Sequence, residues 1–430
     1  MPGAPGSFPI GTAVTMRDLD TNLHPVLRRL RASEPVSWLP VLGGWLVTRR
    51  DVVLRVLRDS RTFTVDDPRF STARVIGPSM LSLDGAEHKR HRDPFAEAFR
   101  TGAAAAQLEE VAEAEAARLV AGFAAAGGAE LRRSLAGPLA VAVVADVLGL
   151  GQTDPKAILG WYDEIVGAVS ALAGQSGEDH ELGRAAGGSA AFAELSASLR
   201  AAMASAHEAR GPHEARGPQG ARGPQGACGP HGAHAHSLLA AAAGAGGLGD
   251  AEVVSNAAVL MFGGIETTEG MICNAVLHLL GHPAQLAGVI ADPRLAANAV
   301  EESLRLEPAA AVVDRYATAD VALAGASIRR GDLVTVSLAG ANRDPVVFAD
   351  PDRFDARRAN ARQNLAFAHG PHFCLGAQLA RAETRAAVAA LFRLPGLRLD
   401  PASRSVPRGV VFRKPPALHV LWDVPAPSCS

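Results

Sequence analysis

The segment that most constrains the fold begins at Asp250 and ends at Gly281 and Pro283. Apolar side chains recur there on nearly every face of a predicted helix of about 30 residues, roughly 45 Å long. A helix that is apolar all round is buried. It is not a membrane span, because Glu-Thr-Thr-Glu at 266–269 interrupts the apolar run. With 48% hydrophobic residues among 430, the chain can bury the large core that such a helix needs.

The charge balance is nearly even, with 42 Lys and Arg against 44 Asp and Glu. No global basic field argues for nucleic acid or an anionic membrane as a partner, so a small-molecule substrate fits better. Residues 1–15 are rich in Pro and Gly and are expected to be flexible. They have neither the charged stretch nor the apolar core of a signal peptide or membrane anchor. We therefore expect a cytoplasmic protein.

Periodicity predicts a mostly helical chain. Residues 104–150 and 154–174 are Ala- and Leu-rich with helical spacing, and a strand at 45–48 precedes a short helix. The segment 207–236 differs, because it repeats a six-residue unit rich in Gly and Pro that can propagate neither a helix nor a sheet. We expect 207–236 to be a low-complexity surface loop inserted in one domain that covers 16–430.

The histidines of the loop 207–236 make metal binding an alternative function. A mobile loop, however, cannot hold its ligands in a fixed coordination geometry. The cysteines show no spacing typical of a zinc knuckle or a disulfide framework. The residues concerned are His207, His213, His231, His234, His236, Cys228, Cys273, Cys374 and Cys429.

The sharpest chemical signal is FAHGPHFCLG, which contains Phe367, Gly370, Cys374 and Gly376 and precedes a helical pattern. A thiolate at the start of a helix is stabilised by the positive end of the helix dipole and by nearby backbone N–H groups. Gly370 lets the loop turn, and Gly376 lets a ligand approach the helix closely. A buried structural cysteine and a zinc site are the alternatives. The zinc site would use His369, His372 and Cys374, but no second ligand cluster completes it.

This loop resembles the haem-binding loop of the cytochrome P450 family, with Ala368 where the family usually has Gly or a small polar residue. The resemblance spans about residues 40 to 415 and implies heme b (iron protoporphyrin IX) with Cys374 as the axial ligand of the metal. It also implies the cytochrome P450 fold, which is mainly α with small β-sheets in a single triangular domain.

Glu302 and Arg305 form a Glu-x-x-Arg motif whose spacing puts both side chains on one helix face. Alone this pattern is weak, since such pairs are common on solvated helices. In the family the pair is buried and fixes the loop before the cysteine through another arginine, for which Arg353 is the best match. The resemblance therefore implies a structural role for these three residues.

The segment GGIETT places two glycines in the middle of the buried helix, at a cost of roughly 1 kcal/mol each, which asks for a functional reason. In the family this segment crosses the oxygen-binding face of the haem. The resemblance implies that Gly263 contacts the haem, that Glu266 feeds protons from solvent and that Thr267 assists their delivery during dioxygen activation.

Further matches concern the haem propionates. His88 and Arg92 in HKRHR, Arg315 and His372 match family propionate donors, although each alone is more typical of a surface charge. The segment ANRDP at 341–345 matches a scaffold segment.

The family reaction implies a monooxygenase that activates dioxygen to hydroxylate or epoxidise a hydrophobic small molecule of secondary metabolism. The protein is expected to be a monomer that receives electrons from a separate ferredoxin and ferredoxin reductase. Candidate docking contacts are Arg92, Arg362 and Arg381.

Alternatives are direct use of peroxide, which the pair Glu266 and Thr267 argues against, and oxidative coupling or ring formation without oxygen insertion. A non-catalytic haem sensor is a third. Variable apolar segments are expected to line the substrate pocket, although each could equally be core. The expected pocket residues are Val75, Ile76, Met80, Val259, Phe262, Ala310, Val313 and Val411, within segments that also include Ile165 to Leu172.

Overall fold

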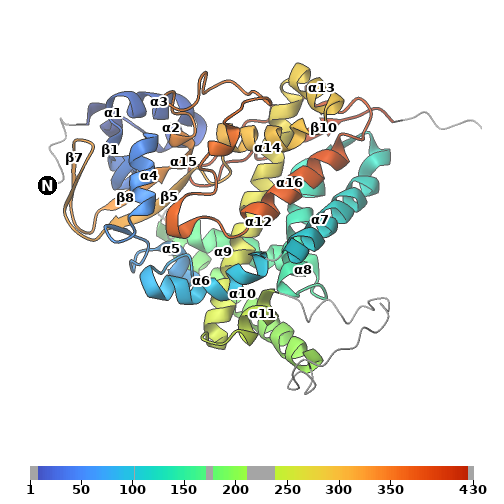
Figure 1. The fold of residues 1–430 in the computed structure, drawn as a ribbon, viewed down its shortest axis with the longest axis horizontal. Helices are drawn as coiled ribbons and strands as arrows, with labels where there is room; N and C mark the ends of the chain where they lie inside the picture. Colours follow the sequence, from blue (N-terminus) through green and yellow to red (C-terminus); the bar gives the residue numbers. More distant parts are fainter. Residues whose placement is uncertain (1–7, 101, 171–177, 211–237, 425–430) are drawn as a thin grey trace, which may run out of the picture. The chain divides into compact units, whose positions relative to one another are not determined.

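A computed structural model describes residues 8–100, 102–170, 178–210 and 238–424 (Figure 1). The chain divides into two compact units, each of which is described by itself. Unit 1 consists of Met1–Asp67, Glu109–Ala140 and Glu266–Ser430, and unit 2 of Pro68–Leu108 and Val141–Ile265. The single domain expected over 16–430 stays a prediction.

Unit 1 contains the sheets together with helices at both ends of the chain. Its helices are α1 (Pro9–Thr12), α2 (Met16–Thr21), α3 (Leu23–Ser33), α4 (Arg50–Arg58), most of α7 (Gly102–Phe123), the second half of α12 (Asp250–Leu280), α13 (Pro283–Ala291), α14 (Leu295–Leu306), α15 (Leu338–Ala341) and α16 (Ala377–Leu391). Its strands are β1 (Val36–Leu39), β2 (Gly44–Val47), β3 (Phe63–Thr64), β4 (Gly128–Glu130), β5 (Val312–Ala317), β6 (Val321–Leu323), β7 (Ala326–Ile328), β8 (Leu333–Ser337), β9 (Arg398–Leu399) and β10 (His419–Leu421).

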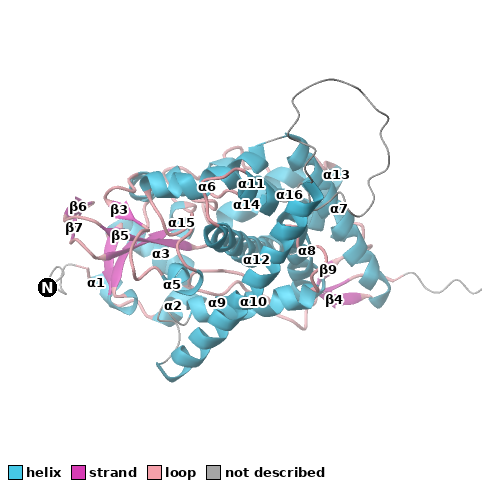
Figure 2. Cartoon of the chain, turned by 90° about the horizontal axis from the view of Figure 1, so that it is seen from below, coloured by secondary structure: helices cyan, strands magenta, loops and turns pink. Residues whose placement is uncertain are grey.

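The main sheet has the strand order β1-β2-β8-β5-β3, and a three-stranded sheet of order β4-β10-β9 lies well apart from it (Figure 2). The pair β2 and β8 is parallel and sets Trp45 opposite Val334. Trp45 is fully buried, and its Nε1 donates to Asp332 at 2.9 Å. Valines and leucines of α4 pack on these strands, because their helical spacing gives that helix one apolar face.

Unit 2 is helical in its described residues. Its helices are α5 (Ser71–Ile76), α6 (Gly85–Arg100), the start of α7, α8 (Gly137–Leu148), α9 (Pro155–Ser170), α10 (Glu178–Arg210), α11 (Leu238–Gly244) and the first half of α12.

Several sequence predictions are confirmed. The strand before α4 is β2, and α12 begins at Asp250 and ends just before Gly281. The mainly α class with small sheets is also confirmed.

Two segments differ from the expected loops. Within 1–15, the residues Pro9–Thr12 form α1, and the Glu34 carboxylate accepts hydrogen bonds from the backbone of Ile10 (2.7 Å) and Gly11 (3.0 Å) in that helix, whereas the expected flexibility stays a prediction. The helix α10 continues through His207 to Arg210, into the range expected to be a loop. The rest of that loop, with Cys228, and also Cys429 and Leu172, lies outside the described residues.

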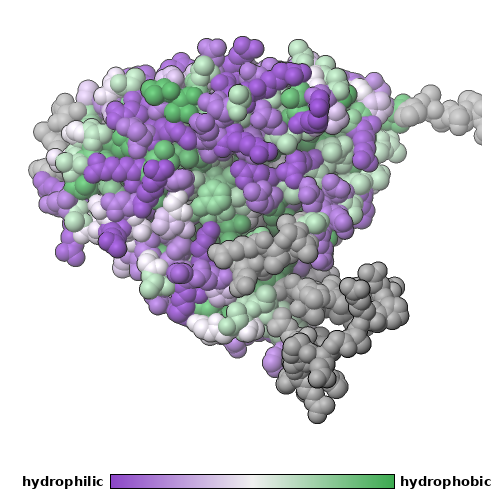
Figure 3. Space-filling model, viewed as in Figure 1, coloured by the Kyte–Doolittle hydropathy of each residue, from purple (hydrophilic) through white to green (hydrophobic). Residues whose placement is uncertain are grey.

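The face in Figure 3 carries hydrophilic side chains interspersed with smaller apolar patches. Among the described helices, none combines the length and the apolar character that crossing a membrane requires.

Candidate functional site

The cysteine loop of unit 1 is closed by its own backbone. The N–H of Cys374 donates to the carbonyl of Phe367 at 3.0 Å, and the N–H of Phe373 donates to Gly370 at 3.1 Å. Gly376 is the N-cap of α16, and Cys374 is exposed just before it. The loop therefore presents the thiol at the N-terminus of a 15-residue helix.

Two residues of the loop have left-handed backbone conformations. Gly370 has φ +78°, and a Cβ at that position would clash with the carbonyl oxygen of Leu57 at the end of α4. The position therefore requires glycine. Ala368 has φ +58°, so the departure from the family pattern noted at this residue places a Cβ in a strained region of backbone space.

Phe367 and Arg381 fix the loop against α16. The Arg381 guanidinium lies 4.4 Å from the centre of the Phe367 ring, and its Nε donates to Glu301 at 2.6 Å. Arg381 is thus engaged within unit 1, which argues against the docking role expected for it. Arg362 is exposed, as such a role requires.

Glu302 and Arg305 of α14 form a fully buried ion pair with two contacts, at 2.7 and 2.9 Å. The third side chain is Arg358, whose Nε donates to both oxygens of Glu302 at 3.0 Å. The prediction of Arg353 was wrong. Its side chain is exposed, and only its carbonyl takes part, accepting from Arg305 at 3.1 Å.

Asn342 links this cluster to the cysteine loop. Its carbonyl accepts from Arg305 at 3.0 Å, and its side-chain oxygen accepts from the N–H of Leu365 at 2.6 Å. The Leu365 carbonyl in turn accepts from Ala368 at 2.9 Å. Within the predicted scaffold segment at 341–345, Asn342 thus makes this link with both its backbone and its side chain.

The second half of α12 carries the predicted acid. Glu266 is 7% exposed, and its Oε1 lies 2.8 Å from Nζ of Lys414. Thr267 is partly exposed, whereas Thr268 is buried. Sequence reasoning missed Lys414. Its position just after the apolar run at 410–412 is the signal that could have found it.

Two expected propionate donors also lie in unit 1. Arg315 is buried on β5 and donates to the carbonyl of Asp314 at 2.7 Å. Burial raises the pKa of Asp314, although Thr335 and Arg315 oppose that shift. His372 is half-buried in the turn Gly370–His372.

In unit 2, α6 carries the other expected donors. His88 is buried and Arg92 is half-buried, and their spacing of four residues puts them on one helix face. Gly263 of α12 borders open space, because a Cβ there would meet nothing within 4 Å, whereas one on Gly264 would clash with Val144.

The expected pocket residues of unit 2 are held by the first half of α12. Ser255 donates to the carbonyl of Ile76 at 2.8 Å, and Asn256 accepts from the N–H of Met80 at 2.7 Å. Val259 and Phe262 are buried on the same helix, and Val75 is half-buried on α5.

In unit 1, Ala310 pairs with Phe412 in an isolated bridge beside Val411, so the C-terminal segment lies along the start of β5. Val313 packs against the core of the main sheet, which favours the alternative that it is core.

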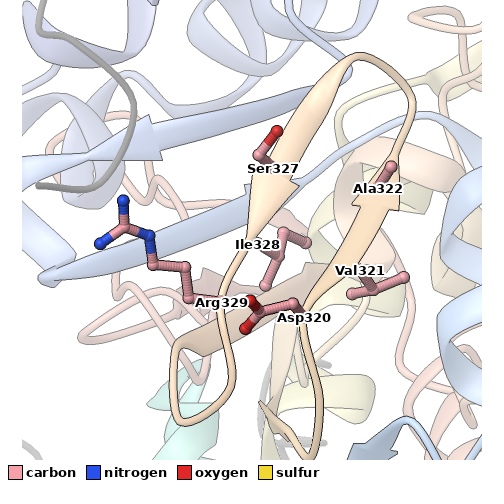
Figure 4. Close-up of a pocket in the computed structure, with 6 residues that line it drawn as sticks. All are labelled: Asp320, Val321, Ala322, Ser327, Ile328 and Arg329. Carbon is pink, nitrogen blue, oxygen red and sulfur yellow. The ribbon is translucent and has the colours of Figure 1, made fainter.

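A surface pocket of about 280 Å³ lies on the hairpin β6–β7 (Figure 4). None of the predicted site residues lines it, and most of its lining side chains are exposed. The lining residues are Asp320, Val321, Ala322, Ser327, Ile328 and Arg329.

The residues present fit a haem in three respects. Cys374 offers an exposed thiol at a helix N-terminus. A Cβ on Gly376 would meet nothing within 4 Å, so a flat ligand has room beside the helix start. Arg315 of the same unit supplies a buried guanidinium group of the type that a carboxylate requires.

Comparisons with known proteins agree with this fit. A family model described as cytochrome P450 matches residues 289–408. The chain is 34% identical to cytochrome P450 monooxygenase PikC of Streptomyces venezuelae over 89% of this chain and 86% of that protein. It is 32% identical to mycinamicin IV hydroxylase/epoxidase of Micromonospora griseorubida, over 91% and 94% respectively. The crystal structure of CalO2 superposes with a TM-score of 0.81 at 31% identity, covering 96% of this chain and 99% of that one. The chain belongs to the cytochrome P450 family, and it is accordingly an oxidoreductase that binds heme b.

Proposed function

We propose that Cys374 would hold the haem iron through its thiolate and that the enzyme hydroxylates or epoxidises a hydrophobic small molecule of secondary metabolism. The observation that carries this proposal is the closed loop that presents an exposed cysteine at the N-terminus of α16. The relatives PikC and mycinamicin IV hydroxylase/epoxidase support it, because their names describe oxygen insertion.

Haem, when bound and reduced, supplies dioxygen activation. The protein holds it through Cys374 and through Gly376, whose lack of a side chain permits close approach. His88, Arg92, Arg315 and His372 would hold its propionates, and Gly263, where a Cβ would meet nothing within 4 Å, would contact it. Phe367 and Gly370 keep the loop in shape.

Glu266 and Thr267 are proposed to move protons. Glu266 takes a proton from solvent at its carboxylate and passes it toward the hydroxyl of the half-buried Thr267, the next residue of α12. A carboxylate and an alcohol side by side suit this relay, because one exchanges protons readily and the other can both donate and accept.

The substrate is proposed to contact apolar side chains such as Val259 and Phe262, which are buried on the first half of α12. Electrons are proposed to come from a separate ferredoxin and ferredoxin reductase, with the exposed Arg362 as a docking contact. An assay in which charge reversal at Arg362 leaves the reduction rate unchanged would count against that contact.

Product analysis under isotopic dioxygen tests the reaction class. The haem-loaded protein, supplied with a bacterial ferredoxin and reductase, is screened against hydrophobic compounds that shift its absorption spectrum. We expect products that carry one labelled oxygen atom. Products that lack the label and have lost two hydrogens would instead establish oxidative coupling or ring formation.

A further inference from the structure

Glu266 and Glu269 lie three residues apart on α12, so their carboxylates share one helix face. Both are buried, at 7% and 2% exposure. Two buried carboxylates at this spacing repel each other and lose hydration, so both stay ionised only where cations balance them.

Two cations of unit 1 supply that balance. Nε of Arg132 contacts Oε1 of Glu269. Nζ of Lys414 lies 2.8 Å from Oε1 of Glu269 and also 2.8 Å from Oε1 of Glu266. Glu269 therefore has two cationic partners, whereas Lys414 is the cation in contact with Glu266 among the described residues.

The backbone around Lys414 is fixed on several sides. Lys414 and Arg408 exchange backbone hydrogen bonds of 3.2 and 3.0 Å. The neighbouring Arg413 pairs with Glu307 at 2.7 Å, and its carbonyl accepts from Asn274 at 3.0 Å. The lysine side chain, 10% exposed, thus starts from a hydrogen-bonded segment, and its buried ammonium group lies between the two carboxylates.

We propose that Lys414 is a positioning residue that holds Glu266 as an oriented carboxylate between proton transfers. This inference rests on the proposed proton-relay role of Glu266. When Glu266 takes a proton from solvent, Lys414 keeps its own charge and retains Glu269 as its partner. Loss of that proton toward Thr267 restores the contact with Glu266. Arg132 alone still balances Glu269, so the contribution of Lys414 falls mainly on Glu266.

The charge sum explains why removal of Lys414 matters. With Lys414 present, two cations face two carboxylates and the buried cluster is neutral. Without it, Arg132 is the one cation left among the described residues of the cluster and contacts Glu269, so the excess negative charge favours a proton that stays on Glu266. A Glu266 that keeps its proton cannot take the next one from solvent.

The first test needs no turnover. Infrared spectra of haem-loaded protein with isotope-labelled glutamate are compared for the wild type, Lys414→Met, Lys414→Arg and Lys156→Met. Lys156 is the matched control, because it is exposed on α9 in unit 2. We expect Lys414→Met alone to gain a protonated carboxyl band, and we expect Lys414→Met/Glu266→Gln to lose it.

A second readout uses NADPH oxidation by the protein with a bacterial ferredoxin and reductase. We expect Lys414→Met to slow it roughly tenfold or more with a larger solvent deuterium isotope effect, and we expect Lys414→Arg to restore both. No new carboxyl band together with an unchanged isotope effect would overturn the proposal.

If Lys414→Met fails to take up haem, the variant Glu269→Gln is measured in its place. Lys414 then serves Glu266 alone, so Glu266 should remain a carboxylate, and a protonated Glu266 in this variant would overturn the proposal. If the wild type lacked thiolate ligation, the proposed function would be wrong. The infrared comparison would still show whether Lys414 controls the protonation of Glu266.

Discussion

Arg358 donates from one Nε to both carboxylate oxygens of Glu302, at 3.0 Å each, although 56 residues separate them in the chain. Arg358 also donates to the carbonyls of Ala349 and Asp350, at 2.6 and 3.2 Å. It thereby fixes the irregular segment that precedes the cysteine loop onto α14.

Replacement of Arg358 by Met should therefore destabilise the protein by about 1.5 to 3 kcal/mol, because Glu302 loses a charged hydrogen-bond donor while Arg305 still balances its charge. We expect lower haem content and a lower midpoint in thermal unfolding. Arg353→Met is the matched control, because that side chain is exposed, and it should change stability by no more than about 0.5 kcal/mol. Equal losses in both variants would contradict the assignment of Arg358.

Ala368→Gly should stabilise the haem-loaded protein, by about 1 kcal/mol, since a left-handed backbone strains alanine but not glycine. Gly370→Ala should do the reverse, because its Cβ meets the Leu57 carbonyl. Thermal unfolding followed by the haem absorption measures both. A destabilising Ala368→Gly would show that the greater freedom of glycine in the unfolded chain outweighs relief of strain.

Glu383 of α16 is buried, and its Oε2 has no hydrogen-bond partner among the described residues. Burial raises the pKa of its carboxyl well above the usual 4.5. The folded chain then keeps a proton that the unfolded chain releases. The contribution of Glu383 to stability is complete below pH 4.5 and is lost as the pH rises toward the folded pKa.

Glu383→Gln removes this titration, so its stability relative to the wild type should increase as the pH rises from about 5 to about 8. Thermal unfolding across that range measures the difference. Parallel curves for the two proteins would mean that Glu383 does not titrate differently on folding.

The sequence predicted features that depend on regular spacing. The length and burial of α12 followed from its apolar pattern, and the position of Glu302 and Arg305 on one face of α14 followed from their three-residue separation, whereas the buried pair was implied by the family resemblance. Features that depend on irregular backbone were missed. Arg353 and Arg358 stand in the same non-helical segment, and only the path of that segment decides which guanidinium turns inward.

Composition also did not predict helix α1 at the N-terminus, where Pro and Gly are frequent. The stabilising partner is Glu34, 24 residues away from Ile10, and no local pattern reports such a contact. Lys414 is a similar case, since its two carboxylate partners lie on α12, far away in the sequence.

We propose that Cys374 binds the haem iron as a thiolate. The most direct test is the absorption spectrum of the reduced protein under carbon monoxide, for the wild type and for Cys374→Ala, with the buried Cys273→Ala as control. We predict a strongly red-shifted Soret band in the wild type and in Cys273→Ala that is lost in Cys374→Ala. A wild type that is folded and loaded with haem but lacks this band, or a band that persists in Cys374→Ala, would contradict the assignment.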